Sequence, residues 1–149
     1  MKKPAEVRAA LVACIKTIQK SSGYANDVEA SHVYPKWSQQ IADAQDDNLY
    51  PKIFVVMETG NDNRLIGDNA RLELDFAVVV IVKKIKTTDD PQVMADSFLD
   101  DFEKMIKLQD TLNGTVHDVS LPNFAVDGGA LDPEGAVVVR LHTERYTFS

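Results

Sequence analysis

The longest strand signal in the chain is ARLELDFAVVVIVKKIK, residues 70–86. Apolar side chains alternate onto one face, beginning with Leu72, Leu74 and Phe76, as in a strand that buries one side. The other face is charged in its first half and apolar in its second, which predicts that the end of the strand is buried on both faces. At ~3.3 Å per residue this strand would span about 55 Å, whereas a domain of this chain length is roughly 40 Å across. We therefore expect a strand that bends, breaks, or projects as an arm toward a neighbouring subunit.

The flanking sequence predicts one α+β domain, residues 1–149. Residues 52–58 form a second strand, and the turn-rich residues 59–69 join it to the long strand as a hairpin. Helices are predicted over residues 7–18 and from Asp90, an N-cap followed by Pro91, to Ile106. Further strands are predicted over 115–121 and 136–148 around a loop at 122–135. Weaker signals indicate a short strand over 27–34 and a short helix or loop at 38–46. These elements predict an antiparallel β-sheet of four to five strands, with two main helices packed on one face and a long β-hairpin arm.

The composition disfavours two classes of partner. Sixteen Lys and Arg against 23 Asp and Glu give a formal net charge of −7, whereas a general nucleic-acid binder needs basic side chains against the phosphates. No apolar run approaches the ~20 residues that span a bilayer, so no membrane is expected as a partner. The start of the chain does not resemble a signal peptide, and the single cysteine, Cys14, falls on the apolar stripe of the first helix. We expect a protein made in the cytoplasm, with Cys14 in its core.

The histidines do not indicate a metal centre. His32, His117 and His142 occur singly, without the spacing of metal-ligand motifs. His117 and His142 fall on predicted strands, where a surface or cross-strand role is expected. No glycine-rich phosphate-binding motif is present either.

The acidic residues also indicate no reaction centre. Asp89-Asp90 is a helix-capping signal, and Asp100-Asp101 is interpreted as a solvated helix face because adjacent helical residues do not face each other. Oxygen-bearing side chains around the hairpin turn could ligate a hard cation but do not match a calcium loop; they are Glu58, Asn61, Asp62, Asn63 and Asp68. We therefore predict no catalytic, cofactor-binding or metal site, and a protein that is not an enzyme.

The sequence does not determine what covers the second face of the sheet. Residues 53–57, 78–82 and 137–141 are apolar on both faces, and two helices can cover only one of them. The second face is covered either from within, by residues 38–46 and the loops, or by another subunit. With the overlong hairpin, the second alternative predicts a protein built to oligomerise.

Several of these features occur in the same order in one protein family. The N-terminal helix leads into GYANDV (23–28). YPKIFV (50–55) places a proline directly before a strand, and the long strand and the second helix follow. DTLNG (110–114) then precedes a strand, and RYTF (145–148) closes the chain. In this arrangement the chain resembles the tail terminator, or tail completion, proteins of long-tailed bacteriophages, a family of minor tail proteins.

The resemblance implies a structural function in the virion. Family members form a hexameric ring that caps the head-proximal end of the tail tube, stops tube polymerisation and offers a surface to the head-completion, or neck, proteins. Partners are then the chain itself, the tail tube protein and a neck protein, while DNA passes through the lumen without specific binding, which an acidic ring would favour. Asp62, Arg64, Leu65 and Ile66 of the hairpin are the expected contacts to subunits or tube, with a self-packed loop tip as the alternative.

Three other functions are kept open. One is another phage neck component, such as a head-tail connector or head-closure protein. A second is a dimeric regulatory α+β domain that binds a small ligand. The third is a small enzyme whose site is assembled from dispersed Asp, His and Ser residues.

Overall fold

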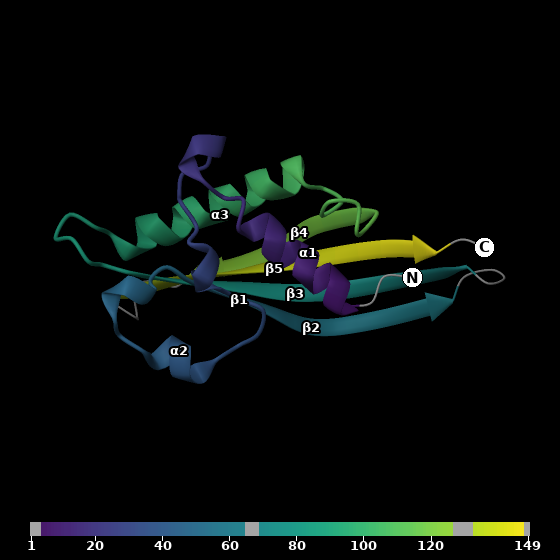
Figure 1. Ribbon diagram of the computed structural model, residues 1–149, viewed down its shortest axis with the longest axis horizontal. Helices are drawn as coiled ribbons and strands as arrows, with labels where there is room; N and C mark the ends of the chain where they lie inside the picture. The colour runs from purple at the N-terminus through teal and green to yellow at the C-terminus, as the bar shows by residue number, and fades with distance from the viewer. Residues whose placement is uncertain (1–3, 65–68, 127–132, 148–149) are drawn as a thin grey trace.

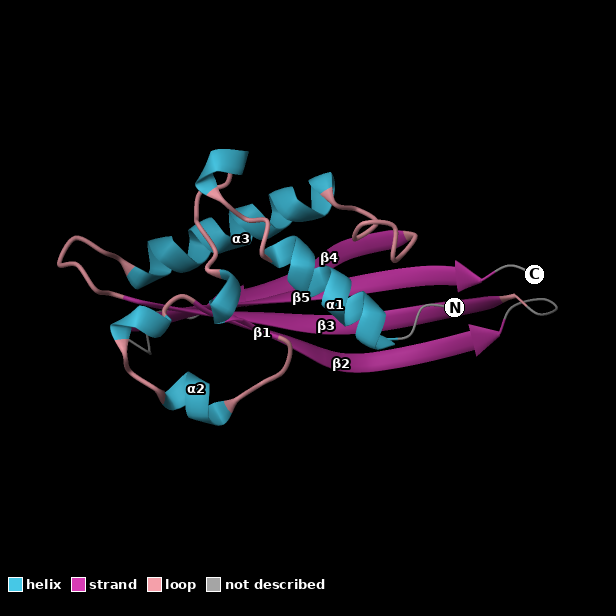
Figure 2. Cartoon of the chain, viewed as in Figure 1, coloured by secondary structure: helices cyan, strands magenta, loops and turns pink. Residues whose placement is uncertain are grey.

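The computed structural model describes residues 4–64, 69–126 and 133–147 as a sheet with helices on both faces (Figures 1 and 2). The elements in chain order are α1 (Pro4–Ile15), β1 (Val33–Tyr34), α2 (Gln39–Asp43), β2 (Lys52–Arg64), β3 (Ala70–Lys83), α3 (Pro91–Leu108), β4 (Asp118–Val126) and β5 (Glu134–Thr147). Short 3₁₀ turns lie at Lys20–Ser22, Ala30–His32 and Asp47–Leu49. The predicted α+β class is confirmed.

The sheet is mixed, which corrects the prediction of a wholly antiparallel one. Its strand order is β1-β2-β3-β5-β4, and β1 pairs in parallel with β2 through Val33 opposite Ile53 and Tyr34 opposite Phe54. All other neighbours are antiparallel. A parallel pair needs a crossover connection, and the chain makes it here through α2 and the turn after it.

The main core lies between the sheet and the helices α1 and α3, which cover the same face (Figure 1). Leu72, Leu74 and Phe76 point into it, as their alternation predicts, and Cys14 is buried there. The start of α3 also agrees with its sequence: the Asp90 carboxylate accepts a hydrogen bond from the Gln92 amide at 3.0 Å. Both amphipathic patterns therefore specify the same buried layer.

The second face is covered from within over part of its extent. α2 packs there against a small apolar cluster that contains Tyr50, Phe54 and Ile81. Lys52 is fully buried beneath it, and its Nζ donates to the carbonyl oxygens of Ala42 and Ala44 at 3.1 and 2.5 Å. This lysine replaces the missing partners of carbonyls at the C-terminal end of α2.

β2, β4 and β5 extend into residues predicted to be turn or loop. β2 continues through the turn-rich residues 59–64, after a bulge between Met57 and Thr59, because β3 pairs with it as far as Arg64 opposite Ala70. β4 continues past Pro122 to Val126, with a register shift between Ser120 and Asn123. Pro122 is tolerated because β4 is an edge strand.

The hairpin of β2 and β3 is flanked by a third strand. β5 pairs with β3 over its whole length, from Lys83 opposite Glu134 to Ala70 opposite Thr147. β3 contains 14 residues, fewer than the 17 predicted, and Leu72 and Leu74 remain buried near its start. The described strands of the hairpin, β2 and β3, therefore form a three-stranded extension of the sheet together with β5.

Candidate functional site

The part of the outer sheet face that α2 leaves uncovered carries a group of polar side chains. Alternation along β3 and β5 turns the apolar side chains toward α1 and α3 and the charged ones to the opposite side. The polar side chains of these strands on this side are Arg71, Glu73, Asp75, Arg140, His142, Glu144 and Tyr146. They come from two segments about 70 residues apart in the chain, and the pairing of β3 with β5 makes them neighbours.

His142 lies opposite Asp75 in this register, and Asp75 holds the imidazole ring in place. The Nδ1 of His142 lies 2.6 Å from Oδ1 of Asp75, and the Thr59 hydroxyl donates to Oδ2 of Asp75 at 2.7 Å. These contacts hold the pKa of Asp75 below its usual value, with the Thr59 hydrogen bond as the larger cause. Asp75 is therefore a carboxylate that orients the imidazole ring.

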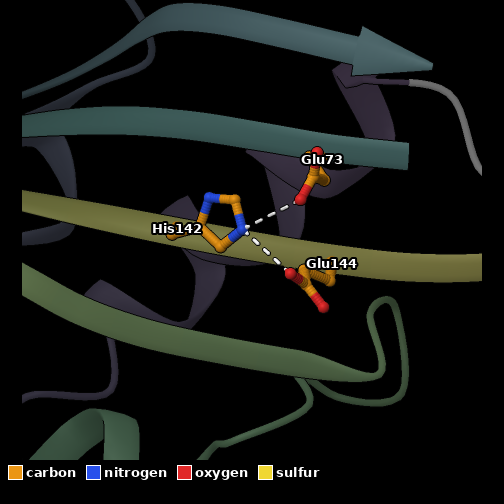
Figure 3. A group of neighbouring side chains, drawn as sticks. All are labelled: Glu73, His142 and Glu144. Atoms are coloured by element: carbon orange, nitrogen blue, oxygen red, sulfur yellow. Dashed lines mark hydrogen bonds and ion pairs between the residues drawn. The ribbon is translucent and has the colours of Figure 1, made fainter. Parts of the chain in front are cut away.

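The other ring nitrogen of His142 faces two further carboxylates. Its Nε2 lies 3.2 Å from Oε1 of Glu144 and 3.7 Å from Oε1 of Glu73 (Figure 3). Figure 3 shows the three side chains converging, with Glu73 on β3 and the other two on β5. Asp75 in the first place, and Glu144 in addition, raise the pKa of His142 above its usual value.

Further groups hold the two glutamates. The Tyr146 hydroxyl donates to Oε2 of Glu144 at 2.7 Å, which lowers the pKa of Glu144 and raises that of Tyr146. An Arg71 nitrogen, Nη2, lies 3.5 Å from Oε1 of Glu73. Glu144 therefore uses one oxygen for Tyr146 and the other for His142, whereas the same Glu73 oxygen, Oε1, faces both Arg71 and His142.

We call Glu73, Asp75, His142 and Glu144 the outer-face cluster. The imidazole can hold a proton shared with Asp75 and Glu144, or, when neutral, can present the Nε2 lone pair beside two carboxylates. The ligand atoms of Glu73, His142 and Glu144 all lie within 4.8 Å of one another, close enough to surround one metal ion.

A hollow of about 240 Å³ adjoins the cluster on the same face. Asp75 contributes to both the cluster and the wall of the hollow, and Arg140 in that wall forms an ion pair with Glu58, Nε to Oε1, at 3.3 Å. The wall consists of Glu58, Thr59, Asp75, Phe76, Pro122, Asn123, Arg140 and Leu141.

The residues predicted to contact subunits or the tube are not part of this cluster. Asp62 and Arg64 lie in the last three residues of β2, where their backbones pair with β3. Leu65 and Ile66 lie outside the described residues. The predicted contact role of these four residues remains a prediction.

The interpretation of Asp101 as solvated is wrong. Asp101 is buried and accepts hydrogen bonds from the backbone amides of Ala25 and Asn26 at 2.7 and 3.0 Å. Its neighbour Asp100 is exposed, as predicted. A loop distant in the sequence folds onto α3 and supplies the donors, which the helical pattern alone does not reveal.

His142 lies on a strand, β5, as predicted, whereas the prediction that His117 lies on a strand is wrong, because β4 begins only at Asp118. His117 precedes β4, and its Nδ1 accepts a hydrogen bond from the Tyr146 amide at 2.9 Å. The partners of His142 were not predicted, although the sequence contains a signal for them. Acidic residues alternate on the wet half of β3, and a His-x-Glu pair, His142 and Glu144, lies on one face of β5.

Comparison of the chain with protein-family models finds no matching family, and no curated protein matches it either. Within the described residues, every helix is too short or too polar to cross a lipid bilayer.

Proposed function

We propose that this chain is a structural protein that assembles head to tail into a closed ring. The observation that supports this most directly is a sheet whose two edges are unpaired within residues 4–64, 69–126 and 133–147. Among the described strands, β4 pairs only with β5, so the outer side of Asp118–Val126 has no strand partner there. β1 pairs only with Ile53 and Phe54, so the rest of β2, as far as Arg64, has no further partner on its outer side among these strands.

The two edges differ and lie at opposite borders of the sheet, with β3 and β5 between them (Figure 1). Long unpaired edges are normally blocked, because they can pair with other chains. Contact between the β4 edge of one copy and the β2 edge of the next is heterologous, and such contacts generate a ring when the rotation closes. Phe124 on β4, with 51% of its surface exposed, supplies an apolar contact at this edge.

Within the class of ring proteins, we propose a phage tail terminator located in the neck region of the virion, on the resemblance of the sequence to that family. Six copies would cap the tail tube, stop its growth and offer the opposite surface to a head-completion protein. Asp62 and Arg64, at the end of β2, stay in this proposal as contacts to a subunit or the tube. The net charge of −7 per chain would let DNA pass through the lumen without adhering.

Mass measurement of the full chain tests ring assembly. Light scattering and native mass spectrometry, alone and with the tail tube protein of the same virus, should give a species six times the 16.5 kDa chain mass, and electron microscopy should show rings. Phe124→Lys should abolish this species, because a charged side chain at the edge opposes strand addition. The matched control is Val93→Lys, which makes the same kind of change at an exposed position of α3 and should leave the ring intact.

Other outcomes would contradict the proposal. A chain that stays monomeric both alone and with the tube protein would refute ring assembly. A stable dimer would favour the small-ligand-binding regulatory domain instead. A ring that forms but leaves the length of tail tubes unchanged would favour another neck component, such as a connector.

A further inference from the structure

The outer-face cluster places two carboxylates directly opposite each other. Glu73 on β3 and Glu144 on β5 are register partners, and like charges in this position destabilise a sheet. His142 lies two residues from Glu144 on the same face and directs Nε2 toward both of them (Figure 3). A cation held between the two carboxylates would remove their repulsion, so the arrangement favours a positively charged occupant.

The tautomer of a neutral His142 follows from its second contact. Asp75 is an acceptor 2.6 Å from Nδ1, so the ring proton belongs on Nδ1 and the Nε2 lone pair faces Glu73 and Glu144. A carboxylate that binds the distal nitrogen of a histidine is the usual support of a metal-ligating imidazole. This contact is made from outside the ligand set and specifies which nitrogen is free to ligate.

The distances fit a small tetrahedral ion. Ligands at about 2.0–2.1 Å from zinc stand about 3.3 Å apart in a tetrahedron. Nε2 of His142 lies 3.2 and 3.7 Å from Oε1 of Glu144 and of Glu73, and all three ligand atoms lie within 4.8 Å of one another, so side-chain rotations of the two glutamates would bring them to this spacing. An imidazole ligand favours zinc-class ions over Ca²⁺ and Mg²⁺, which prefer oxygen.

We propose that Glu73, His142 and Glu144 bind one divalent zinc-class cation, with Asp75 as the positioning residue. The backbones of all three ligands are held in paired strands, which makes the site largely preformed. Their side chains are partly exposed, between 18% and 27%, so an ion can enter and a water molecule can complete its coordination. Arg71 lies 3.5 Å from the same Glu73 oxygen, Oε1, that faces His142, so Arg71 and the ion would share this carboxylate.

Calorimetric titration of the chelator-treated full chain with ZnCl₂ tests the site. We expect one ion per chain, and Co²⁺ in its place should give the visible absorption of a tetrahedral complex. His142→Ala and Glu144→Gln should each weaken binding at least tenfold. Asp75→Asn should weaken zinc binding by about 10- to 100-fold while the Co²⁺ complex remains tetrahedral, because Asp75 orients a ligand without being one.

Matched controls separate the site from adventitious binding. His117→Ala removes another partly accessible histidine and Glu58→Gln another acid of the outer face, and both variants should bind zinc as the unmodified chain does. Circular dichroism establishes that each variant is folded. Absence of zinc binding, binding unchanged by His142→Ala, or equal competition by Mg²⁺ would overturn the proposal.

Discussion

Asp101 offers a quantitative test of how the N-terminal loop is attached to α3. Its carboxylate accepts three hydrogen bonds: from the Ala25 amide at 2.7 Å, from the Asn26 amide at 3.0 Å and from Nδ2 of Asn26 at 2.8 Å. Asp101→Asn keeps the shape of the side chain but replaces one acceptor oxygen with a donor. The control is Asp100→Asn, the same change one residue away on the exposed side of the helix.

The magnitude follows from the number of bonds lost. In the variant the amide oxygen can turn toward Asn26 and keep two bonds, while the Ala25 amide then faces an NH₂ group. One hydrogen bond to a charged acceptor is worth about 1.5–3 kcal/mol, and the two bonds that remain lose their charge assistance. We expect Asp101→Asn to lower the free energy of unfolding by about 2–4 kcal/mol, or roughly 5–10 °C in Tm for a domain of this size.

Urea unfolding and thermal melting measure this difference, and hydrogen exchange localises it. The amides of Ala25 and Asn26 should exchange faster in Asp101→Asn, whereas Asp100→Asn should remain within 0.5 kcal/mol of the unmodified chain. Equal stabilities of the two variants would refute the conclusion that the buried carboxylate anchors the loop.

Three further predictions concern other parts of the fold. Gly135→Ala places a Cβ 2.7 Å from the carbonyl oxygen of Pro91 and should lower the free energy of unfolding in urea by about 1–3 kcal/mol. An unchanged unfolding midpoint would contradict the close approach of the two backbones. Lys52→Met removes the ammonium donor from the carbonyls of Ala42 and Ala44, and Ala44 keeps only the Tyr50 hydroxyl at 3.4 Å. This change should lower the free energy of unfolding by about 1–3 kcal/mol and speed proteolysis around α2. Proteolytic resistance equal to that of the unmodified chain would be inconsistent with this anchor. Burial in the first place, and Glu134 in addition, raise the pKa of Tyr50 to about 12. An unfolded tyrosine titrates near pH 10, so the contribution of Tyr50 to the free energy of unfolding should be full below about pH 10 and should be lost as the pH rises toward 12. Absorbance at 295 nm, compared with Tyr50→Phe, should show this ionisation near pH 12, and a step near pH 10 would mean that Tyr50 is not buried.

The elements that local signals specify could be predicted from the sequence. Asp90 and Pro91 begin α3 because a cap and its following proline act within one turn, and the alternation in β3 assigns its two faces correctly. The parallel pairing of β1 with β2 could not be predicted, because β1 has only two residues and its direction depends on the α2 connection. The end of β2 was missed for a related reason: Gly60 and Asn61 are turn residues by type, and β3 nevertheless imposes strand pairing on them.

The candidate site illustrates the same limit. Alternation predicts that Glu73 and Asp75 share the wet face of β3, and this is confirmed. Whether Glu73 and Asp75 contact His142 and Glu144 depends on the register of β5 against β3. A shift of one residue would turn the side chains of His142 and Glu144 to the other face. The site is therefore a product of register, which no motif in the sequence encodes.

The ring and metal proposals use different parts of the sheet and can fail separately. Ring assembly needs the outer edges of β2 and β4, whereas the metal ligands lie on β3 and β5 between them. If subunits join edge to edge, the outer-face cluster stays outside the interface, and its charge faces the lumen or an axial partner. Phe124→Lys should then abolish the ring and leave one zinc ion per chain, while His142→Ala should abolish zinc binding and leave the ring mass unchanged. If either variant removed both properties, the edges and the cluster would belong to one interface, and the edge-to-edge arrangement would be wrong.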